Sequence, residues 1–346
     1  MSSYPPEWDT LEEEQPVIEA EPQPPQETPG RQAPPPRTRQ RQPERRRRSD
    51  KLSKLALGIS VLALILAAIA LFFALKPEPE PEEEPPAPPV VEEPITFKFG
   101  DRVLTPLEGM PLNPYDRDSF SLDEKGRITY EKDGKRARTG VDVSTYQKEI
   151  DWQAVAADGI DFAILRVGGR GYGPEGNLYW DKYFEQNLAG ATAAGLDVGI
   201  YFFSQAITPQ EAEEEAWQVL SHLRGRPLTY PIVFDWETIS GTPARTDYLD
   251  TATLTACAKT FCECIAIAGY QPMVYFNATN GLLDYDLSQL TAYPFWYAYY
   301  LPSTSTDPWL YYDFRMWQYT SSGTVAGIPG RADMNICFYP YGKTAG

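Results

Sequence analysis

The feature that most restricts the fold of this chain is a repeated alternation of strand-like and helix-like segments, which begins at Thr139. The apolar, β-prone segments are TGVDVS, IDFAILRV, LDVGIYFF, YPIVFDW, PMVYFN, PFWYAYY and FRMWQYT. Helices are predicted between the first five of them, over about 151–158, 178–194, 208–224 and 246–268. This order favours parallel strands with helical crossovers. An open, doubly wound sheet is the alternative, but no glycine-rich phosphate loop follows any predicted strand.

The later connections are shorter than the earlier ones, so the second half of the predicted sheet has less room for covering helices. We therefore predict an α/β fold for residues 139–346, a parallel (β/α) barrel with an irregular second half.

A second feature is an uncharged apolar run of 21 residues, Leu55–Leu75. A helix rises about 1.5 Å per residue, so this run spans roughly 30 Å, the thickness of a bilayer core. The run is longer than the apolar part of a cleaved signal peptide, and it ends in KPEPEPEEE rather than at a small-residue cleavage site. We predict a single, uncleaved transmembrane helix over residues 55–75.

The charges beside this run predict its orientation. Basic residues, including Arg45–Arg48, precede it, and acidic residues follow Lys76. Positively charged flanks stay in the cytoplasm, so we expect a single-pass protein of the cell membrane with residues 76–346 outside. Residues 1–54 have the composition of a disordered cytoplasmic segment, and the Pro/Glu-rich residues 76–94 that of an extended linker.

Residues 95–138 are predicted to form a small β-rich extension before the barrel. ITFKFG alternates in the manner of a strand, and GRITYEKDGKRA contains a DG pair typical of a two-residue hairpin turn. Nothing in this segment indicates a separate function.

Charge and histidine content exclude several classes of function. The net charge is −17, and an acidic protein repels nucleic acid. The single histidine, His222, cannot supply a multi-histidine metal site, and it lies in a polar helical stretch unsuited to a Ser-His-Asp triad. The four cysteines lack a zinc-finger spacing and are interpreted as buried thiols. No metal or organic cofactor is predicted.

The motif Asp235-Trp236-Glu237 carries the main chemical signal. It follows the apolar strand segment Ile232–Phe234, and strand residues i and i+2 point to the same side with Cα atoms about 6.6 Å apart. In barrels the carboxyl ends of the strands bear the active site. Two close carboxyl groups do not ionise equally, so one pKa rises, as glycosidic bond cleavage requires. Alone, the motif also fits an inert, solvated acidic loop.

Other predicted strands carry polar residues where an apolar side chain is expected. Asp142 lies within the first strand and Arg166 within the second, and a charge there needs a partner or a polar cavity. Aromatic residues near acids commonly hold sugar rings, although each one alone also fits a place in the core. The candidates for substrate binding are Arg166, Tyr201, Trp236, Trp296, Tyr299, Trp317 and Gln318.

Several ordered motifs resemble glycoside hydrolase family 25, the lysozyme-like N-acetylmuramidases. They are TGVDVSTYQKEIDW, FAILRVGGRGYG, LDVGIYFFSQA, PIVFDWE, FWYAYY and MWQYTSSGTVAGIPGRADMN. The resemblance implies a flattened, irregular (β/α) barrel of the TIM-like type. It also implies cleavage of the β-1,4 bond between N-acetylmuramic acid and N-acetylglucosamine in the glycan strands of peptidoglycan. It covers residues from about 139 to the end.

The resemblance also implies roles for individual residues. Glu237 would be the general acid/base, and Asp235 would orient the substrate's acetamido group, which could serve as an internal nucleophile. Asp142 would belong to the same carboxylate cluster. Asp333 matches another Asp that is common in the family and is a further candidate for substrate binding. Some members of the family carry a further Asp after the WxA segment, where this chain has Tyr299. Retention of configuration is implied by the resemblance, because the strand spacing alone suits either outcome.

Three other functions stay open on the sequence. The barrel could be a wall-binding module without catalysis, or a glycosidase for another polysaccharide. The chain could also be a wall-tethered scaffold for protein partners, which the sequence does not identify.

Overall fold

The computed structural model describes residues 65–69, 71, 95–300, 306, 308, 310–339 and 341. Most of the predicted membrane segment Leu55–Leu75 lies outside these residues, as do the predicted cytoplasmic segment 1–54 and all of the linker 76–94. Residues 65–69 and 71 are helical. None of the helices formed by the described residues combines the length and apolarity needed to cross a membrane.

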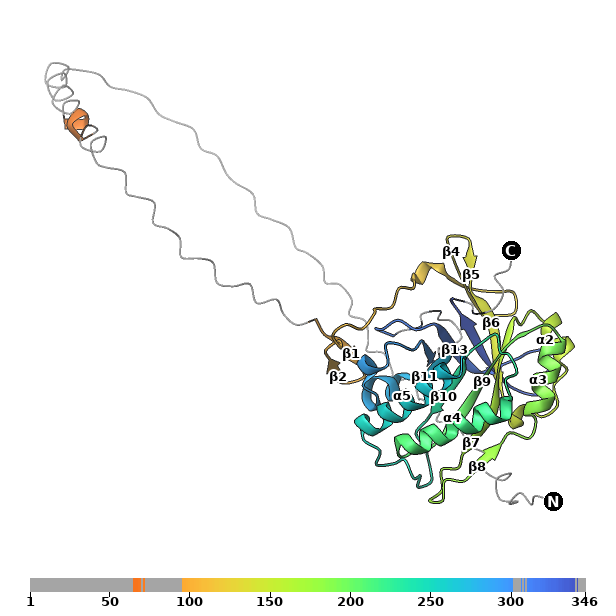
Figure 1. The fold of residues 1–346 in the computed structure, drawn as a ribbon. Coiled ribbons are helices and arrows are strands. Elements are labelled where there is room, and N and C mark those ends of the chain that lie inside the picture. The colour runs from red at the N-terminus through yellow and green to blue at the C-terminus, as the bar shows by residue number, and fades with distance from the viewer. Residues whose placement is uncertain are drawn as a thin grey trace, which may run out of the picture. The chain divides into compact units, whose positions relative to one another are not determined.

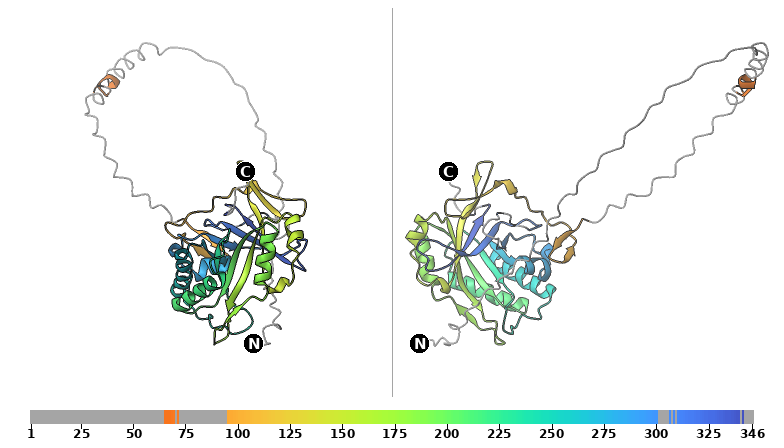
Figure 2. Two further views of the ribbon diagram at one scale, coloured as in Figure 1. Left: turned by 45° about the vertical axis from the view of Figure 1, so that its right-hand side comes forward. Right: turned by 180° about the vertical axis from the view of Figure 1, so that it is seen from behind.

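Residues Pro94–Gly346 form one compact unit. Its main strands and helices are β6 (Arg138–Val143), α2 (Trp152–Ala157), β7 (Phe162–Arg170), β8 (Leu178–Trp180), α3 (Phe184–Ala193), β9 (Asp197–Ser204), α4 (Pro209–Leu223), β10 (Ile232–Trp236), α5 (Thr251–Ile267), β11 (Pro272–Asn277), β12 (Phe295–Ala298), β13 (Met316–Gly323) and β14 (Ala332–Cys337). The four helices lie outside the strands in each view (Figures 1 and 2).

The large sheet closes into a barrel. Its strand order is β6-β14-β13-β12-β11-β10-β9-β7-β8, and an additional β6–β7 pairing joins the first strand to the eighth. Within this closed ring seven strands are parallel, and β14 runs antiparallel to its neighbours β13 and β6. The β6–β7 pairing excludes the open, doubly wound sheet. The barrel-like α/β fold predicted from the sequence is confirmed.

Two details differ from the sequence prediction. Residues Leu178–Trp180, predicted as the start of a helix, form the strand β8, because the far end of β7 extends past the end of β6 and pairs there with an antiparallel partner. The closing strand β14 was not among the predicted strands. Its segment ADMNIC carries polar residues inward, which masks a strand pattern.

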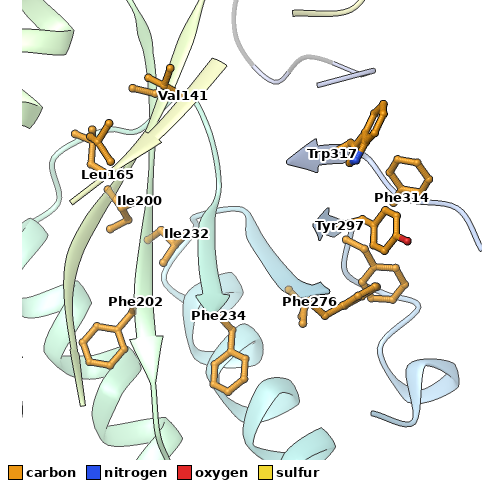
Figure 3. Close-up of a cluster of buried hydrophobic side chains, with 14 of the residues drawn as sticks. Val141, Leu165, Ile200, Phe202, Ile232, Phe234, Phe276, Tyr297, Phe314 and Trp317 are labelled. Carbon is orange, nitrogen blue, oxygen red and sulfur yellow. The ribbon is translucent and has the colours of Figure 1, made fainter. Parts of the chain in front are cut away.

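Alternating strand residues build two hydrophobic layers. Outward-facing residues such as Ile200, Phe234 and Phe276 pack in the larger core cluster (Figure 3). Inward-facing residues at the amino ends of the strands fill the barrel with Phe162, Ile164, Val233, Met273, Trp296, Met316 and Cys337. Apolar side chains thus fill this end of the barrel, and the inward-facing polar residues Asp142, Asp235 and Gln318 lie toward the opposite, carboxyl end of the parallel strands.

The β11–β12 connection differs from the earlier ones. It contains a π-helical turn, Asn280–Asp284, and a 3₁₀ turn, Leu287–Gln289, in place of a longer α-helix. The β12–β13 connection includes residues outside the described part of the chain. A less regular second half was expected from the shorter connections in the sequence.

The extension forms two small sheets. One pairs β1 (Phe97–Phe99) with β2 (Arg102–Leu104), and the other contains β3 (Phe120–Leu122), β4 (Ile128–Lys132) and β5 (Lys135–Arg136). Between β4 and β5, Asp133 and Gly134 have φ angles of 53° and 71°, as a two-residue hairpin turn requires. The hairpin indicated by the DG pair is therefore present.

Aromatic contacts attach the extension to the barrel. The ring of Tyr115 stacks on Phe338 with centroids 3.8 Å apart, and its hydroxyl donates to the Phe314 carbonyl. Phe120 meets the edge of Trp317 at 6.0 Å. The extension thus shares one hydrophobic core with the barrel.

Candidate active site

Four carboxylic residues gather at the carboxyl end of the parallel strands. Asp142 is on β6, Asp235 is near the end of β10, Glu237 is the first residue after that strand, and Asp333 is on β14. Asp142 and Asp333 are register partners. The charges of Glu237 and Asp142 raise the pKa of Asp235 and that of Asp333, in both cases after the larger effect of burial. The four groups are therefore close enough to act on one another electrostatically.

Asp142 is a buried carboxylate with two amide donors. Its Oδ2 accepts hydrogen bonds from Gln318 Nε2 and from Asn335 Nδ2, each at 2.7 Å. Burial raises the pKa of Asp142 to about 6, although the two amides stabilise its charged form. Both donors thus fix the direction in which this carboxylate faces.

The two amides are themselves held in place. Gln318 Oε1 accepts from the hydroxyls of Tyr300 at 2.7 Å and Tyr275 at 3.2 Å. Asn335 Oδ1 accepts from Trp296 Nε1 at 2.8 Å. Since each amide oxygen is occupied by a donor, each amide nitrogen must point toward Asp142.

Asp235 is a buried carboxylate whose charge is poorly compensated. It is 5% exposed, and its Oδ1 has no hydrogen-bond partner among the described residues. Burial raises the pKa of Asp235 well above its usual value, Glu237 and Asp142 raise it further, and the nearby Arg166 opposes this rise. Burying a carboxylate without a donor is costly, so this position favours a bound proton or a donor supplied by a ligand.

Glu237 lies beyond the last paired residue of β10. It is half-buried, whereas Asp235 is buried. Its backbone carbonyl accepts a hydrogen bond from Gln205 Nε2 at 3.1 Å. Glu237 is therefore the more accessible carboxylate of the DWE motif.

Arg166 forms the basic side of the site. Its Nε donates to Asp181 Oδ2 at 2.9 Å, and the same oxygen accepts from the backbone N–H of Thr145 at 2.8 Å. The guanidinium carbon lies 5.2 Å from the ring centroid of Tyr146. Tyr146 is 61% exposed, and it sits in a 3₁₀ turn whose capping box joins Ser144 and Gln147. An exposed ring is thus held firmly beside Arg166.

The predicted aromatic residues have different placements. Tyr201 faces inward and meets the edge of Trp296 at 6.3 Å, but Trp296 is 2% exposed inside the barrel. Trp236 and Trp317 face outward into the larger core. Tyr299 also faces outward and stacks on Tyr297, with the two ring centroids 5.8 Å apart. The structure therefore does not bring the rings of Trp236, Tyr299 or Trp317 to the carboxylates, because alternate strand residues face opposite sides.

Sequence reasoning missed several residues of the site. Period-two alternation indicates three of them: Tyr300 follows Trp296 by four residues, Tyr275 follows Met273 by two, and Asn335 follows Asp333 by two. Tyr300, rather than Tyr299, takes the inward position after the WxA segment. Asp181 and Tyr146 lie outside the barrel strands, so no strand period points to them.

A resident metal ion would need several converging donor side chains. Across the residues that the structure describes, no group of three or more His, Cys, Asp or Glu side chains is arranged to hold one.

Comparisons with known proteins agree with this arrangement. The model of a family described as glycosyl hydrolases family 25 matches residues 141–328. The autolytic lysozyme of Clostridium acetobutylicum is 27% identical over 57% of this chain and 54% of its own length. Lysozyme M1 of Streptomyces globisporus is 27% identical over 57% of this chain and 66% of its own length. The chain thus spans less than two thirds of both relatives.

Among solved structures, the spore cortex lytic enzyme SleM of Clostridium perfringens has a similar fold. Its TM-score is 0.50 at 23% identity, over 58% of this chain and 67% of that one.

Proposed function

The chain belongs to glycoside hydrolase family 25, and from that premise we propose that it is a muramidase. Its substrate would be the peptidoglycan glycan strand, cut at the β-1,4 bond between N-acetylmuramic acid and N-acetylglucosamine. The observation that carries this proposal is the cluster of Asp142, Asp235, Glu237 and Asp333 at one end of the barrel. Glycosidic cleavage needs carboxyl groups of unlike proton affinity side by side.

Accessibility separates the roles of the two DWE carboxylates. A general acid must reach the glycosidic oxygen, and Glu237 is the more exposed of the pair. Asp235 is deeper, and its buried Oδ1 lacks a donor among the described residues. An acetamido N–H of the sugar would supply that donor. Asp235 would thereby orient the acetamido oxygen toward the anomeric carbon as an internal nucleophile.

Asp142 and Asp333 would stabilise positive charge that develops at the sugar ring. Asp142 is suited to this role because Gln318 and Asn335 hold its charged form in one orientation. Arg166 and the exposed ring of Tyr146 would border the opposite side of the bound sugar.

The function is tested with the Pro94–Gly346 unit on purified peptidoglycan. The natural sequence should release reducing ends that terminate in muramic acid. Glu237→Gln keeps the size of the side chain and removes the proton donor, so turnover should fall at least about 10²-fold. Release of no reducing ends by the natural sequence, or an unchanged rate in Glu237→Gln, would refute the proposal. Sedimentation with undigested wall would then favour a binding module.

The proposed location is the outer face of the cell membrane, with Leu55–Leu75 as the anchor. The uncharged length of that segment and the basic residues before it support this placement. At about 3.1 Å per residue, an extended linker over residues 77–94 reaches roughly 55 Å. The tether would therefore direct the enzyme to the cell's own wall. Deleting residues 55–75 should move the protein from the membrane fraction to the soluble one.

A further inference from the structure

Gln205 is a fully buried amide directly behind the proposed proton donor. Its Nε2 donates to the Glu237 carbonyl at 3.1 Å, and its Oε1 accepts from Thr246 Oγ1 at 2.8 Å. Gln205 is 0% exposed and Thr246 is 4% exposed. Because the threonine hydroxyl occupies the amide oxygen, the amide nitrogen is directed at Glu237.

Glu237 needs such support because it has left the sheet. The parallel pairing of β10 with β9 ends at Trp236, which lies opposite Ser204. The next residue on each strand is Glu237 on one and Gln205 on the other. The side-chain bond from Gln205 thus continues, by one residue, the support that the strand ladder gives to β10.

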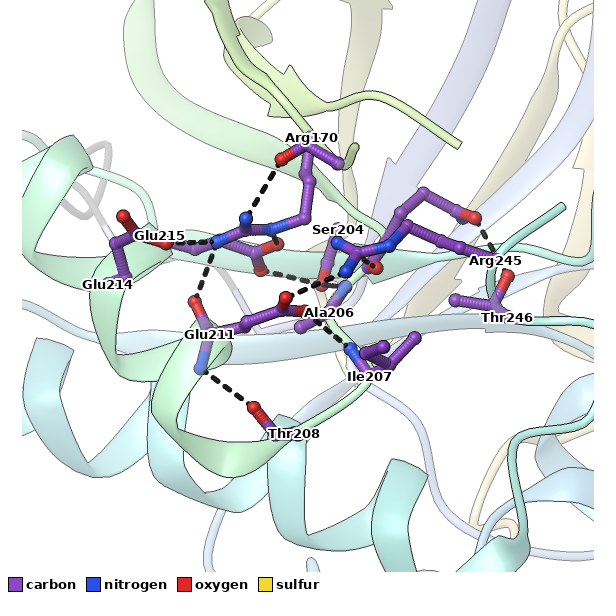
Figure 4. Close-up of polar contacts among 12 residues, drawn as sticks. Arg170, Ser204, Ala206, Ile207, Thr208, Glu211, Glu214, Glu215, Arg245 and Thr246 are labelled. Carbon is purple, nitrogen blue, oxygen red and sulfur yellow. Dashed lines mark hydrogen bonds and ion pairs between the residues drawn. The ribbon is translucent and has the colours of Figure 1, made fainter. Parts of the chain in front are cut away.

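The segment that carries Gln205 is fixed by buried charge (Figure 4). Ser204 Oγ donates to Glu215 Oε2 at 2.6 Å, and Arg170 Nε donates to Glu215 Oε1 at 2.7 Å. On the other side, the Ile207 N–H donates to Glu211 Oε2 at 2.9 Å. Both flanks of Gln205 are therefore held by acids of α4.

The same acids hold the segment that carries Thr246. Arg245 Nη2 donates to Glu211 Oε1 at 2.7 Å, and Arg245 Nη1 donates to the Gln205 carbonyl at 3.4 Å (Figure 4). The two partners, Gln205 and Thr246, are consequently fixed to each other through one network.

A further bond acts on the next residue. Asn280 Nδ2, in the π-helical turn after β11, donates to Thr238 Oγ1 at 3.0 Å. The chain around Glu237 is thus held by Gln205 from the β9 side and by Asn280 from the β11 side.

We propose that Gln205 and Thr246 are positioning residues for catalysis. They would fix the backbone of Glu237, and with it the path of its carboxyl group to the glycosidic oxygen. The inference rests on the proposed role of Glu237 as proton donor. A displaced acid lowers turnover more than binding, since a shift of about 1 Å in a reacting group can cost up to ~10²-fold in rate.

The test uses the full chain and soluble peptidoglycan fragments. Gln205→Met keeps the approximate volume and removes the donor, and Thr246→Val removes the hydroxyl. Each should lower kcat by about 10- to 100-fold with little change in KM. Thr246→Ser keeps the hydroxyl and should restore most of the turnover. The double variant Gln205→Met, Thr246→Val should be no slower than Gln205→Met alone, because both changes break one linkage.

A matched control separates position from stability. Asn187 is a buried amide on α3 that accepts from Trp152 Nε1 of α2 at 3.3 Å, outside the network that joins Gln205, Thr246 and Glu237. Asn187→Leu should lower the melting temperature and leave kcat unchanged. The proposal is overturned if Gln205→Met keeps kcat within twofold of the natural sequence, or if it raises KM and leaves kcat unchanged.

A pH profile supplies a readout that general destabilisation would not produce. A glutamic acid at position 205 can donate to the Glu237 carbonyl only when it is protonated. The activity of Gln205→Glu, divided by that of the natural sequence, should therefore rise as pH falls. The same ratio for Gln205→Met should stay flat. A flat ratio for both variants would contradict the positioning role.

Titration of the Glu237 carboxyl by carbon NMR keeps this inference separate from the muramidase proposal. The midpoint of this titration should shift in Gln205→Met and Thr246→Val and stay unchanged in Thr246→Ser, even if the protein cuts no wall substrate. An unchanged titration in all three variants would overturn the positioning role on its own.

Discussion

Asp142 and Asp333 are direct partners across the antiparallel strands β6 and β14, so adjacent strands bring two carboxyl groups into one site. Burial raises the pKa of Asp333 well above its usual value, and the charge of Asp142 raises it further. The pair exists because β14 is antiparallel to β6, so that the amino end of β14, which carries Asp333, lies beside the carboxyl end of β6, which carries Asp142. Placing several buried carboxyl groups side by side lowers the stability of the fold at pH values where they are charged.

The first prediction concerns that loss of stability. The pKa of Asp142 is raised from 3.8 to about 6, so its contribution to stability is complete below pH 3.8 and is lost as pH rises to about 6. Asp142→Asn removes this pH-dependent loss. Between pH 4 and pH 7, the free energy of unfolding of the natural sequence should therefore fall by up to about 3 kcal/mol more than that of the variant. Urea unfolding at the two pH values measures it. Equal pH slopes in both proteins would contradict the prediction.

The sequence predicted the barrel because its strands are short, apolar and separated by helices. It also indicated Asp142 and Asp235 as candidates, because both carboxylates interrupt apolar runs in a way that few structural roles explain. Alternation within those strands was sufficient to place Asp235 and Glu237 on the same side.

The sequence could not locate contacts that depend on closure of the barrel. Gln318 and Asn335 lie 176 and 193 residues from Asp142, and no local pattern joins them. Trp236 and Trp317 lie away from the carboxylates for another reason. Alternate strand residues face opposite sides of the barrel, and these two rings were chosen for their residue type rather than for their position in the alternation. Asp181 and Tyr146 were missed because they lie outside the barrel strands.

The second prediction tests the closed amino end of the barrel. A Cβ at Gly140 would lie 2.2 Å from the Phe162 ring, so Gly140→Ala should cost about 1–3 kcal/mol in stability. Phe162→Leu should lessen that cost, and the two changes together should cost less than their sum. Chemical unfolding measures all three. A Cβ at Gly173 would meet no heavy atom within 4 Å, so Gly173→Ala is the control and should be neutral.

The third prediction concerns the extension. Arg127 is 7% exposed and bridges to the barrel by an ion pair with Asp158 and a 3.2 Å bond to the Thr324 carbonyl. Arg127→Met removes the donor of the Thr324 carbonyl and one of the donors of Asp158, which keeps Lys125 and the Ala326 N–H. It should lower stability by about 1–3 kcal/mol, as chemical unfolding would measure. The control is Lys135→Met on the exposed strand β5, which should be neutral.

Removal of the extension should have a larger effect than the Arg127 change. A chain that begins at Thr139 loses Phe120 and Tyr115 from the shared core and exposes Trp317 and Phe338. It should melt at lower temperature and bind a hydrophobic dye. If the chain from residue 139 has the same melting temperature as the Pro94–Gly346 unit, the extension is dispensable for folding.

The fourth prediction concerns Tyr146 as a sugar platform. Its ring is 61% exposed, and Arg166 lies beside it at 5.2 Å, so the ring can stack on a pyranose without reordering. An aromatic contact of about 0.5–1.5 kcal/mol corresponds to a factor of about 2–10. Tyr146→Ala should therefore raise KM for soluble peptidoglycan fragments by that factor with little change in kcat, and Tyr146→Phe should retain the natural KM.

Trp217 on α4 is the matched control for this change, because it is 57% exposed on the outer helical layer. Trp217→Ala should leave both KM and kcat unchanged. Uniform binding energy is lost through KM alone, whereas a group that acts only in the transition state would lower kcat. A fall in kcat with constant KM would thus assign Tyr146 to the chemical step, and no change in either constant would remove it from the site.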